Sequence, residues 1–289
     1  MPSLIDLRRR IRSVQNTQQI TKAMKMVSAA KLRRAQQGAL ASRPYADLLN
    51  EMLSSVLGHL GESAESIGHP LMARREPKRT LVLFLSGEKG LCGAFNSNTG
   101  KAFDGFLKEY EGAGVEVEAV GKKAREFCVR NELPLSGEWA NVLTNVDHKV
   151  AEKIAVSVID RFSNGEIDAV WMIYNRFKSV LAREIEIRPL LPVEPPEADK
   201  GAGVDYIYEQ PPAHLFSTLL PRYVMANVYQ AMLESAASEH SARMTAMDSA
   251  TRNAGEVLDQ LTLHLNRVRQ ASITTELIEV VSGAAAAAE

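Results

Sequence analysis

The sequence predicts an α/β protein that combines an antiparallel coiled coil of two long terminal helices with a central, Rossmann-like open sheet of mostly parallel strands. Helical patterns run almost unbroken over about 3–57 and 213–282, whereas a mean helix has about 11 to 12 residues. Between 78 and 200, short apolar runs alternate with helical segments, which is the order that produces a parallel sheet. We therefore expect three regions: a first helix over 1–60, an α/β domain over 78–200 and a last helix over 211–289.

The first helix carries a seam whose residues recur at alternating steps of three and four, the spacing that keeps one face against a partner helix. The seam begins with Leu4, Leu7, Ile11, Val14, Gln18 and Thr21. We expect it to continue through small and soft residues, namely Ala23, Met24, Val27 and Ala30. About 55 residues at a rise of 1.5 Å span roughly 80 Å, too long for a globular core to bury. Gly38 and Pro44 predict local bending.

The middle of the chain contains three short apolar runs that predict strands buried on both faces, at 80–85, 115–120 and 169–174. Helical patterns separate these runs, at 96–111, 122–131 and 147–162. A further strand over 180–188 is expected at an edge of the sheet. The Pro-, Glu- and Gly-rich segment 189–212 then predicts a linker. This order predicts helices on both faces of an open sheet.

The last helix repeats the spacing of a coiled-coil seam. Near its carboxyl end the seam residues are Ala254, Leu258, Leu261, Leu265, Val268 and Ser272. Nearer the middle we expect the seam to consist of Ala226, Tyr229, Leu233, Ala236, Met244 and Met247. Pro221 and Gly255 predict local bends. Because helices this long need a partner, we expect the two ends of the chain to pair, rather than to lie separately on a large core.

The composition bounds the class of protein. The chain has 45% hydrophobic and 24% charged residues, enough apolar mass for a fair-sized core. No apolar run approaches the 18 or so residues of a membrane-spanning helix. Cys92 and Cys128 have neither metal-ligand spacing nor a disulfide framework, so a reduced, cytosolic setting is the default expectation.

A strong charge asymmetry lies behind the formal net charge of -1. Through residue 43 the only acidic residue is Asp6, against a series of Arg and Lys, whereas 184–209 is mainly acidic. Four interpretations fit the basic helix: a surface for an acidic protein partner, a solvated charged face, a nucleic-acid arm and a transit peptide. The first aromatic residue is Tyr45, which disfavours nucleic acid, and the helical pattern continues past residue 50, which disfavours a cleavable segment.

The sequence contains no convincing catalytic motif. The turn Ser86–Gly93 follows the first predicted strand, where such folds bind phosphates, but it lacks the Gly-Lys-Ser/Thr of a P-loop, and a structural tight turn is the favoured interpretation. No Gly-x-Ser-x-Gly elbow or His-Glu-x-x-His pair occurs. We therefore predict no catalytic residue, cofactor or metal site. An enzyme that binds nucleotide on the central domain and a coiled-coil scaffold remain alternatives.

Five segments in order carry a resemblance to a known family. They are Ile20–Val27 (ITKAMKMV), Gly90–Gly93 (GLCG), Asp205–Glu209 (DYIYE), Ser238–Met247 (SEHSARMTAM) and Ala271–Ala284 (ASITTELIEVVSGA). With these, the chain resembles the gamma subunit of the bacterial F-type ATP synthase over nearly its whole length. The alanine run Ala284–Ala288 is longer than this family leads us to expect, Glu88 stands in place of an expected aspartate, and the cysteine pair of the chloroplast type is absent.

The resemblance implies a rotor rather than an enzyme. In that family the paired terminal helices stand inside a ring of alpha and beta subunits, while the central domain and the foot of the helices meet the epsilon subunit and the c-ring of the membrane rotor. The resemblance thus implies ATP synthesis coupled to proton transport by a non-catalytic, peripheral subunit at the cytoplasmic face of the plasma membrane. It implies neither contact with nucleic acid nor a membrane span.

The resemblance also implies contact residues. Arg269, Gln270, Thr274 and Glu276 match the part of the last helix that touches beta-subunit loops. Met24 and Lys25 match a zone that faces an acidic lever of the beta subunit, which gives the basic helix a partner of opposite charge. Tyr206 and Tyr208 match the region that meets the epsilon subunit.

Overall fold

The computed structural model describes residues 4–60, 69–110, 114–193 and 212–287. In chain order its elements are α1 (Leu4–Leu60), the 3₁₀ helix η1 (Pro70–Met72), β1 (Arg79–Leu85), α3 (Phe95–Glu109), β2 (Gly114–Val120), α4 (Lys122–Arg130), β3 (Leu135–Trp139), α5 (His148–Ser163), β4 (Ala169–Phe177), β5 (Arg183–Leu191) and α6 (Pro212–Ala287). The chain divides into two compact units, residues 29–243 and residues 1–28 with 244–289. Both long helices run through both units.

The unit 29–243 is built on one five-stranded sheet with the order β3-β2-β1-β4-β5. Strands β1 to β4 pair in parallel and only β5 runs antiparallel, against β4. The three strands predicted from apolar runs and the predicted edge strand are confirmed as β1, β2, β4 and β5. Strand β3 was missed, and the segment predicted to be a linker begins too early, because β5 extends to Leu191.

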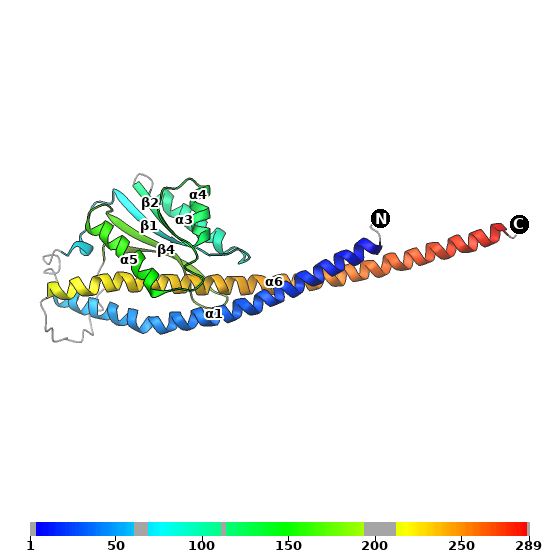
Figure 1. Ribbon diagram of the computed structural model, residues 1–289, viewed down its shortest axis with the longest axis horizontal. Coiled ribbons are helices and arrows are strands. Elements are labelled where there is room, and N and C mark those ends of the chain that lie inside the picture. The colour runs from blue at the N-terminus through cyan, green and yellow to red at the C-terminus, as the bar shows by residue number, and fades with distance from the viewer. Residues whose placement is uncertain (1–3, 61–68, 111–113, 194–211, 288–289) are drawn as a thin grey trace. The chain divides into compact units, whose positions relative to one another are not determined.

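Helices cover both faces of this sheet, as predicted (Figure 1). Helices α3 and α4 pack on one face, where Phe84 of β1 stacks on Phe103 of α3 with ring centroids 4.5 Å apart. On the other face, α5 and the part of α6 from Phe216 to Met232 contribute to the larger core. Burial of apolar side chains in these two layers is the main term that holds the unit together.

One carboxylate lies inside the layer between β2 and α5. Glu118 is only 3% exposed, Ser157 donates a hydrogen bond of 3.4 Å to its Oε1, and its Oε2 has no hydrogen-bond partner. A Cβ at Gly137 would lie 2.8 Å from the Cγ of Glu118, so this glycine leaves the space that the carboxylate occupies. Desolvation by burial raises the pKa of Glu118 against the smaller opposing influence of nearby groups such as Arg161.

Replacement of Glu118 by glutamine is expected to remove a pH-dependent loss of stability. The pKa of Glu118 is higher in the folded state than in the unfolded state. Protonated Glu118 therefore contributes to the stability of the folded state in full below the unfolded-state pKa, and this contribution is lost as the pH rises through the folded-state pKa. The free energy of unfolding of Glu118→Gln, relative to wild type, should therefore increase from acidic to neutral pH in urea titrations. Glu152→Gln, a change at an exposed position of α5, is the control. A pH-independent difference for Glu118→Gln would contradict this assignment.

Within the unit 29–243, α1 and α6 run antiparallel beside each other. Ser42 hydrogen-bonds Gln230, Arg43 lies 3.6 Å from Glu234, and a Cβ at Gly38 would lie 3.3 Å from Leu233. The small residues thus let the helices approach closely. The seam residues Leu233 and Ala236, predicted from the sequence, are buried here.

The unit formed by residues 1–28 and 244–289 is an antiparallel pair made of the first part of α1 and the last part of α6. Leu7 of α1 and Ala254 of α6 are buried, and the predicted seam from Leu258 to Ser272 is partly buried at each seam position. The prediction that the ends of the chain pair as helices is therefore confirmed. None of the helices in the described ranges has both the length and the apolar composition that a membrane crossing requires.

The middle of the α1 seam was predicted wrongly. Ala23, Val27 and Ala30 are exposed, whereas the seam continues in unbroken three-four steps through Thr21, Lys25 and Ser28. Polar partners on α6 make this possible. Lys25 Nζ lies 2.5 Å from Asp248 Oδ1, and the hydroxyl groups of Thr21 and Thr251 are 2.8 Å apart. A continuous helical spacing combined with matched polar pairs therefore outweighs the preference for apolar seam residues.

Candidate functional site

The carboxyl end of α6 is the most exposed apolar segment among the described residues. Every residue from Ile273 to Ala284 is exposed. Five large apolar side chains in this segment are between 49% and 69% exposed, namely Ile273, Leu277, Ile278, Val280 and Val281. Contiguous exposed apolar side chains of this kind mark a surface that contacts another protein.

Four of the residues assigned to a contact by resemblance lie in or beside this segment. Arg269, Gln270, Thr274 and Glu276 are all exposed on the last turns of α6. The hydroxyl of Thr274 donates to the carbonyl oxygen of Gln270 at 2.9 Å, and that of Ser272 lies 3.1 Å from Glu276 Oε1. The polar groups therefore lie on the same exposed end of α6 as the apolar side chains, and protein interfaces combine both kinds of group.

Met24 and Lys25 have different surroundings in the structure. Both residues are partly exposed, but Lys25 occupies a seam position and forms an ion pair with Asp248. The hydrogen bond from Lys25 lowers the pKa of Asp248, so this carboxylate is charged at neutral pH. Tyr206 and Tyr208 lie outside the described residues.

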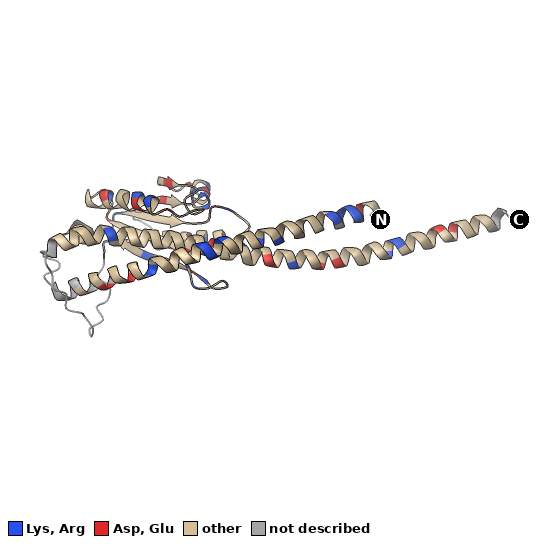
Figure 2. Ribbon diagram, turned by 60° about the horizontal axis from the view of Figure 1, so that its bottom comes forward, with Lys and Arg blue, Asp and Glu red and all other residues tan. Residues whose placement is uncertain are grey.

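Positive charge gathers on the first turns of α1 (Figure 2). Arg8, Arg9, Arg10 and Arg12 are exposed, while Leu7 and Ile11 lie on the seam side. Because these guanidinium groups stay in water, they form an electropositive surface that is available to an acidic partner.

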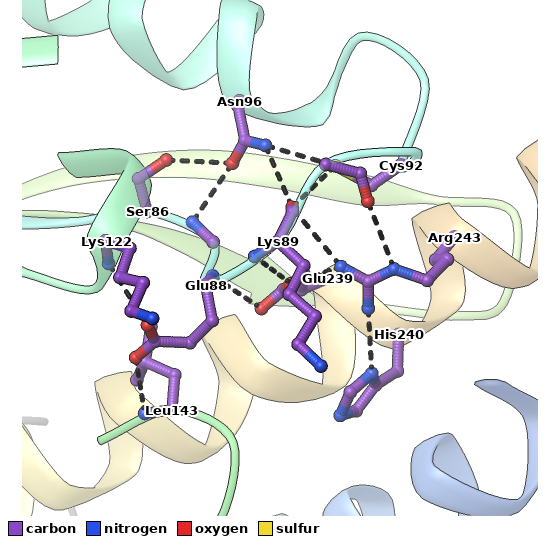
Figure 3. Close-up of polar contacts among 12 residues, drawn as sticks. Ser86, Glu88, Lys89, Cys92, Asn96, Lys122, Leu143, Glu239, His240 and Arg243 are labelled. Carbon is purple, nitrogen blue, oxygen red and sulfur yellow. Dashed lines mark hydrogen bonds and ion pairs between the residues drawn. The ribbon is translucent and has the colours of Figure 1, made fainter. Parts of the chain in front are cut away.

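The turn between β1 and α3 is held by carboxylates that were not recognised in the sequence (Figure 3). Glu88, which is 5% exposed, accepts hydrogen bonds from the backbone N–H groups of Lys122, Asn141 and Leu143 at 3.0 to 3.1 Å. Glu239 of α6 accepts from the N–H groups of Glu88 and Lys89 at 3.2 and 3.1 Å. Both carboxylates are therefore part of the internal structure of the turn.

This geometry decides between the two interpretations of the turn Ser86–Gly93. The N–H of Gly87 donates to Asn96 Oδ1 at 3.0 Å, and the next two N–H groups donate to Glu239. A phosphate cradle needs backbone N–H groups that are directed at the ligand. Here they bind side-chain oxygens of the protein, with a negative charge at the position of the anion. The geometry supports the structural interpretation of the turn.

The two cysteines are poor nucleophiles. Cys92 and Cys128 are buried, and desolvation raises the pKa of both thiols, that of Cys128 to about 11. No cluster of three or more His, Cys, Asp or Glu residues that is suited to a metal ion occurs in the described part of the chain.

Comparison with known proteins matches this architecture along the whole chain. The family model described as ATP synthase matches residues 3–287. The ATP synthase gamma chain of Solibacter usitatus is 53% identical over 287 residues, which cover 99% of this chain and 100% of that protein. The chain belongs to the ATP synthase family. The ATP synthase gamma chain of Pelotomaculum thermopropionicum is 45% identical over 99% of both chains. The resemblance inferred from the sequence is thus confirmed.

Solved structures of this family share the fold. A chain in the central stalk and c-ring structure of the Tetrahymena thermophila mitochondrial ATP synthase is 27% identical, with a TM-score of 0.59 over 80% of this chain and 99% of that chain. A chain of the Euglena gracilis mitochondrial ATP synthase rotor is 19% identical, with a TM-score of 0.66 over 93% of this chain and 98% of that chain. The latter comparison shows the fold, including the long helices and the mostly parallel sheet.

Proposed function

We propose that this chain is the central rotor shaft of a proton-translocating ATP synthase and is itself non-catalytic. The observation that carries the proposal is its full-length identity of 53% to an ATP synthase gamma chain. The antiparallel helices and the exposed apolar end of α6 supply the physical features that a shaft inside a protein ring needs. The partners are then the alpha and beta subunits, the epsilon subunit and the c-ring, at the cytoplasmic face of the plasma membrane.

A shaft can couple rotation to chemistry only by binding the conformations of a catalytic subunit unequally. A surface that contacted all conformations of the beta subunit with the same free energy would shift no equilibrium. The shaft surface is asymmetric around its axis, since the first turns of α1 expose Arg8, Arg9, Arg10 and Arg12 while α6 forms the other side of the helix pair. Rotation therefore presents different chemistry to each beta subunit in turn.

Within this proposal, Arg269, Gln270, Thr274 and Glu276 contact beta-subunit loops, and Met24 with Lys25 faces an acidic segment of the beta subunit. The exposure of the first four residues supports the assignment. The ammonium group of Lys25 is already paired with Asp248, whereas Met24 is partly exposed and is not engaged in an ion pair, so we assign the contact mainly to Met24. Tyr206 and Tyr208 are assigned to the epsilon subunit from the family resemblance alone.

Replacement of Met24 by lysine is expected to loosen coupling. The added charge would form an ion pair with the acidic segment in some rotary positions and hold the shaft there. ATP-driven proton pumping per ATP hydrolysed should fall in membrane vesicles, while the complex still assembles. Met24→Leu keeps an apolar side chain of similar volume and should pump normally. Equal pumping by both variants would refute the assigned contact.

A disulfide between the two helices of the shaft is expected to be harmless. The hydroxyl oxygens of Thr21 and Thr251 are 2.8 Å apart, so Thr21→Cys with Thr251→Cys places two thiols within bonding reach. If α1 and α6 turn together as one shaft, oxidised and reduced complexes should synthesise ATP at the same rate. A loss of synthesis on oxidation, recovered with dithiothreitol, would mean that the helices move against each other during the cycle.

A further inference from the structure

In the unit 29–243, α6 changes the way in which it binds the sheet domain. From Phe216 to Met232 the buried side chains that face the sheet are apolar, apart from Asn227, whose Oδ1 accepts a hydrogen bond of 2.8 Å from Arg188 of β5. From Leu233 to Arg243 every residue is also buried, but the contacts to the sheet domain come mainly from Ser, Glu and Arg side chains. Burial of polar side chains is unfavourable unless each finds a partner, so these contacts need a reason beyond packing.

The first polar contact is made where the pairing between β1 and β4 stops. The last pair between β1 and β4 is Phe84 with Ile173, and Asn175 lies two residues further along β4. The N–H of Asn175 donates to the hydroxyl of Ser235 at 3.4 Å, and its carbonyl oxygen accepts from the hydroxyl of Ser238 at 3.1 Å. Helix α6 thus binds the backbone of β4 beyond the end of β1.

The second contact is to the hairpin between β4 and β5. The hydroxyl of Ser241 donates to the carbonyl oxygen of Val180 at 2.5 Å, and Arg183 Nη1 lies 3.4 Å from the same hydroxyl. Ser241 therefore connects α6 by hydrogen bonds to the hairpin loop between β4 and β5.

The third contact is to the turn between β1 and α3 (Figure 3). Glu239 accepts from the N–H groups of Glu88 and Lys89, and Arg243 donates to the carbonyl oxygens of Gly90 and Lys89 at 3.2 and 3.3 Å. Arg243 and Glu239 also form an ion pair with each other. Burial lowers the pKa of His240 to about 4, so its ring is neutral beside Arg243 at physiological pH.

These contacts surround much of the helix. At about 100° per residue, Ser235, Ser238, Glu239, Ser241 and Arg243 span roughly 200° of its circumference. Their partners are largely backbone groups of three separate segments, which cannot follow a turning helix. Hydrogen bonds weaken steeply when their angles change, whereas apolar contacts have no direction. A rotation of α6 about its own axis would therefore leave many buried groups without partners.

We propose that Ser235, Ser238, Glu239, Ser241 and Arg243 form a rotational lock between α6 and the sheet domain. The proposal rests on the rotor function, since only a shaft that carries torque needs such a lock. Torque applied to the sheet domain enters α6 through these bonds and continues along the single helix to Ala287. The five residues are positioning residues and take no part in nucleotide chemistry.

The test is the torsional stiffness of the rotor in the assembled complex. With the alpha and beta subunits fixed to a surface, the thermal angular fluctuations of a probe on the sheet domain report this stiffness. The variant Ser235→Ala/Ser238→Ala/Ser241→Ala is expected to show wider fluctuations and fewer protons pumped per ATP, with ATP hydrolysis retained. The control is Ser217→Ala/Thr218→Ala, because these exposed hydroxyls bond only within α6, to the carbonyl oxygen of His214.

A triple variant with the fluctuations of the control would overturn the lock. If the triple variant does not assemble, Ser241→Ala alone should widen the fluctuations in the same direction, and an unchanged width would again overturn it. Failure of the rotor function itself has a different signature, because then the probe on the wild-type chain would not turn when ATP is added.

Discussion

Replacement of Glu88 by alanine is expected to destabilise the unit 29–243 severely. The carboxylate accepts three hydrogen bonds from the backbone N–H groups of Lys122, Asn141 and Leu143, of which the bond to Leu143 is buried and the other two are partly buried. A buried donor that loses its partner costs about 1 to 3 kcal/mol and a partly buried donor costs less, so the variant should lose roughly 2 to 6 kcal/mol. A typical domain has a free energy of unfolding of about 5 to 15 kcal/mol.

Tryptophan fluorescence during urea unfolding of the full chain measures this loss, since both tryptophans, Trp139 and Trp171, lie in the unit 29–243. Glu88→Gln keeps one oxygen acceptor and should lose an intermediate amount. A stability of Glu88→Ala within about 1 kcal/mol of wild type would show that water replaces the carboxylate.

Replacement of Gly121 by alanine is expected to have an effect of similar size for a different reason. Gly121 has a φ of 100°, and a Cβ there would lie 2.3 Å from the carbonyl oxygen of Ser86. The clash is with backbone at the end of β1, and Gly121 is itself held by the hydrogen bond from its N–H to the carbonyl oxygen of Trp139 at 2.8 Å. Strain of this kind costs about 1 to 3 kcal/mol, and the clash adds to it.

Gly105→Ala is the matched control for Gly121→Ala. Gly105 is exposed in α3 and a Cβ there meets nothing within 4 Å, so this substitution should stabilise the helix by about 0.5 to 1 kcal/mol. Urea midpoints should therefore move in opposite directions for the two glycines. A Gly121→Ala midpoint equal to that of wild type would mean that the turn rearranges without cost.

The elements with a strong hydrophobic period could be predicted from the sequence. Strands β1 and β4 contain continuous apolar runs, β2 alternates valine with glutamate before Ala119 and Val120, and the ends of α1 and α6 follow a regular three-four spacing. Strand β3 lacks both signals, since Leu135–Trp139 alternates between partial burial and exposure at the edge of the sheet. A short edge strand forms because it hydrogen-bonds to a neighbouring strand, and the local sequence of the edge strand does not reveal that neighbour.

The polar contacts could not be predicted, because their partners lie far apart in the chain. Glu239 binds the N–H of Glu88 across 151 residues, and Lys25 binds Asp248 across 223 residues. From the sequence alone, Lys25 is interpreted as one of many charges on a basic helix, and the apolar residues Ala23 and Val27 are predicted to form the seam. The contact residues near the end of α6 came from family resemblance, since exposed residues leave no periodic signal of their own.

The most direct test of the account is to watch the chain turn. The alpha and beta subunits of the assembled complex are fixed to a surface, a probe is attached to an exposed cysteine introduced on α5, at Glu152, and ATP is added. The probe should rotate steadily in one direction for as long as ATP is hydrolysed. ATP hydrolysis at the normal rate with a probe that stays still would contradict it.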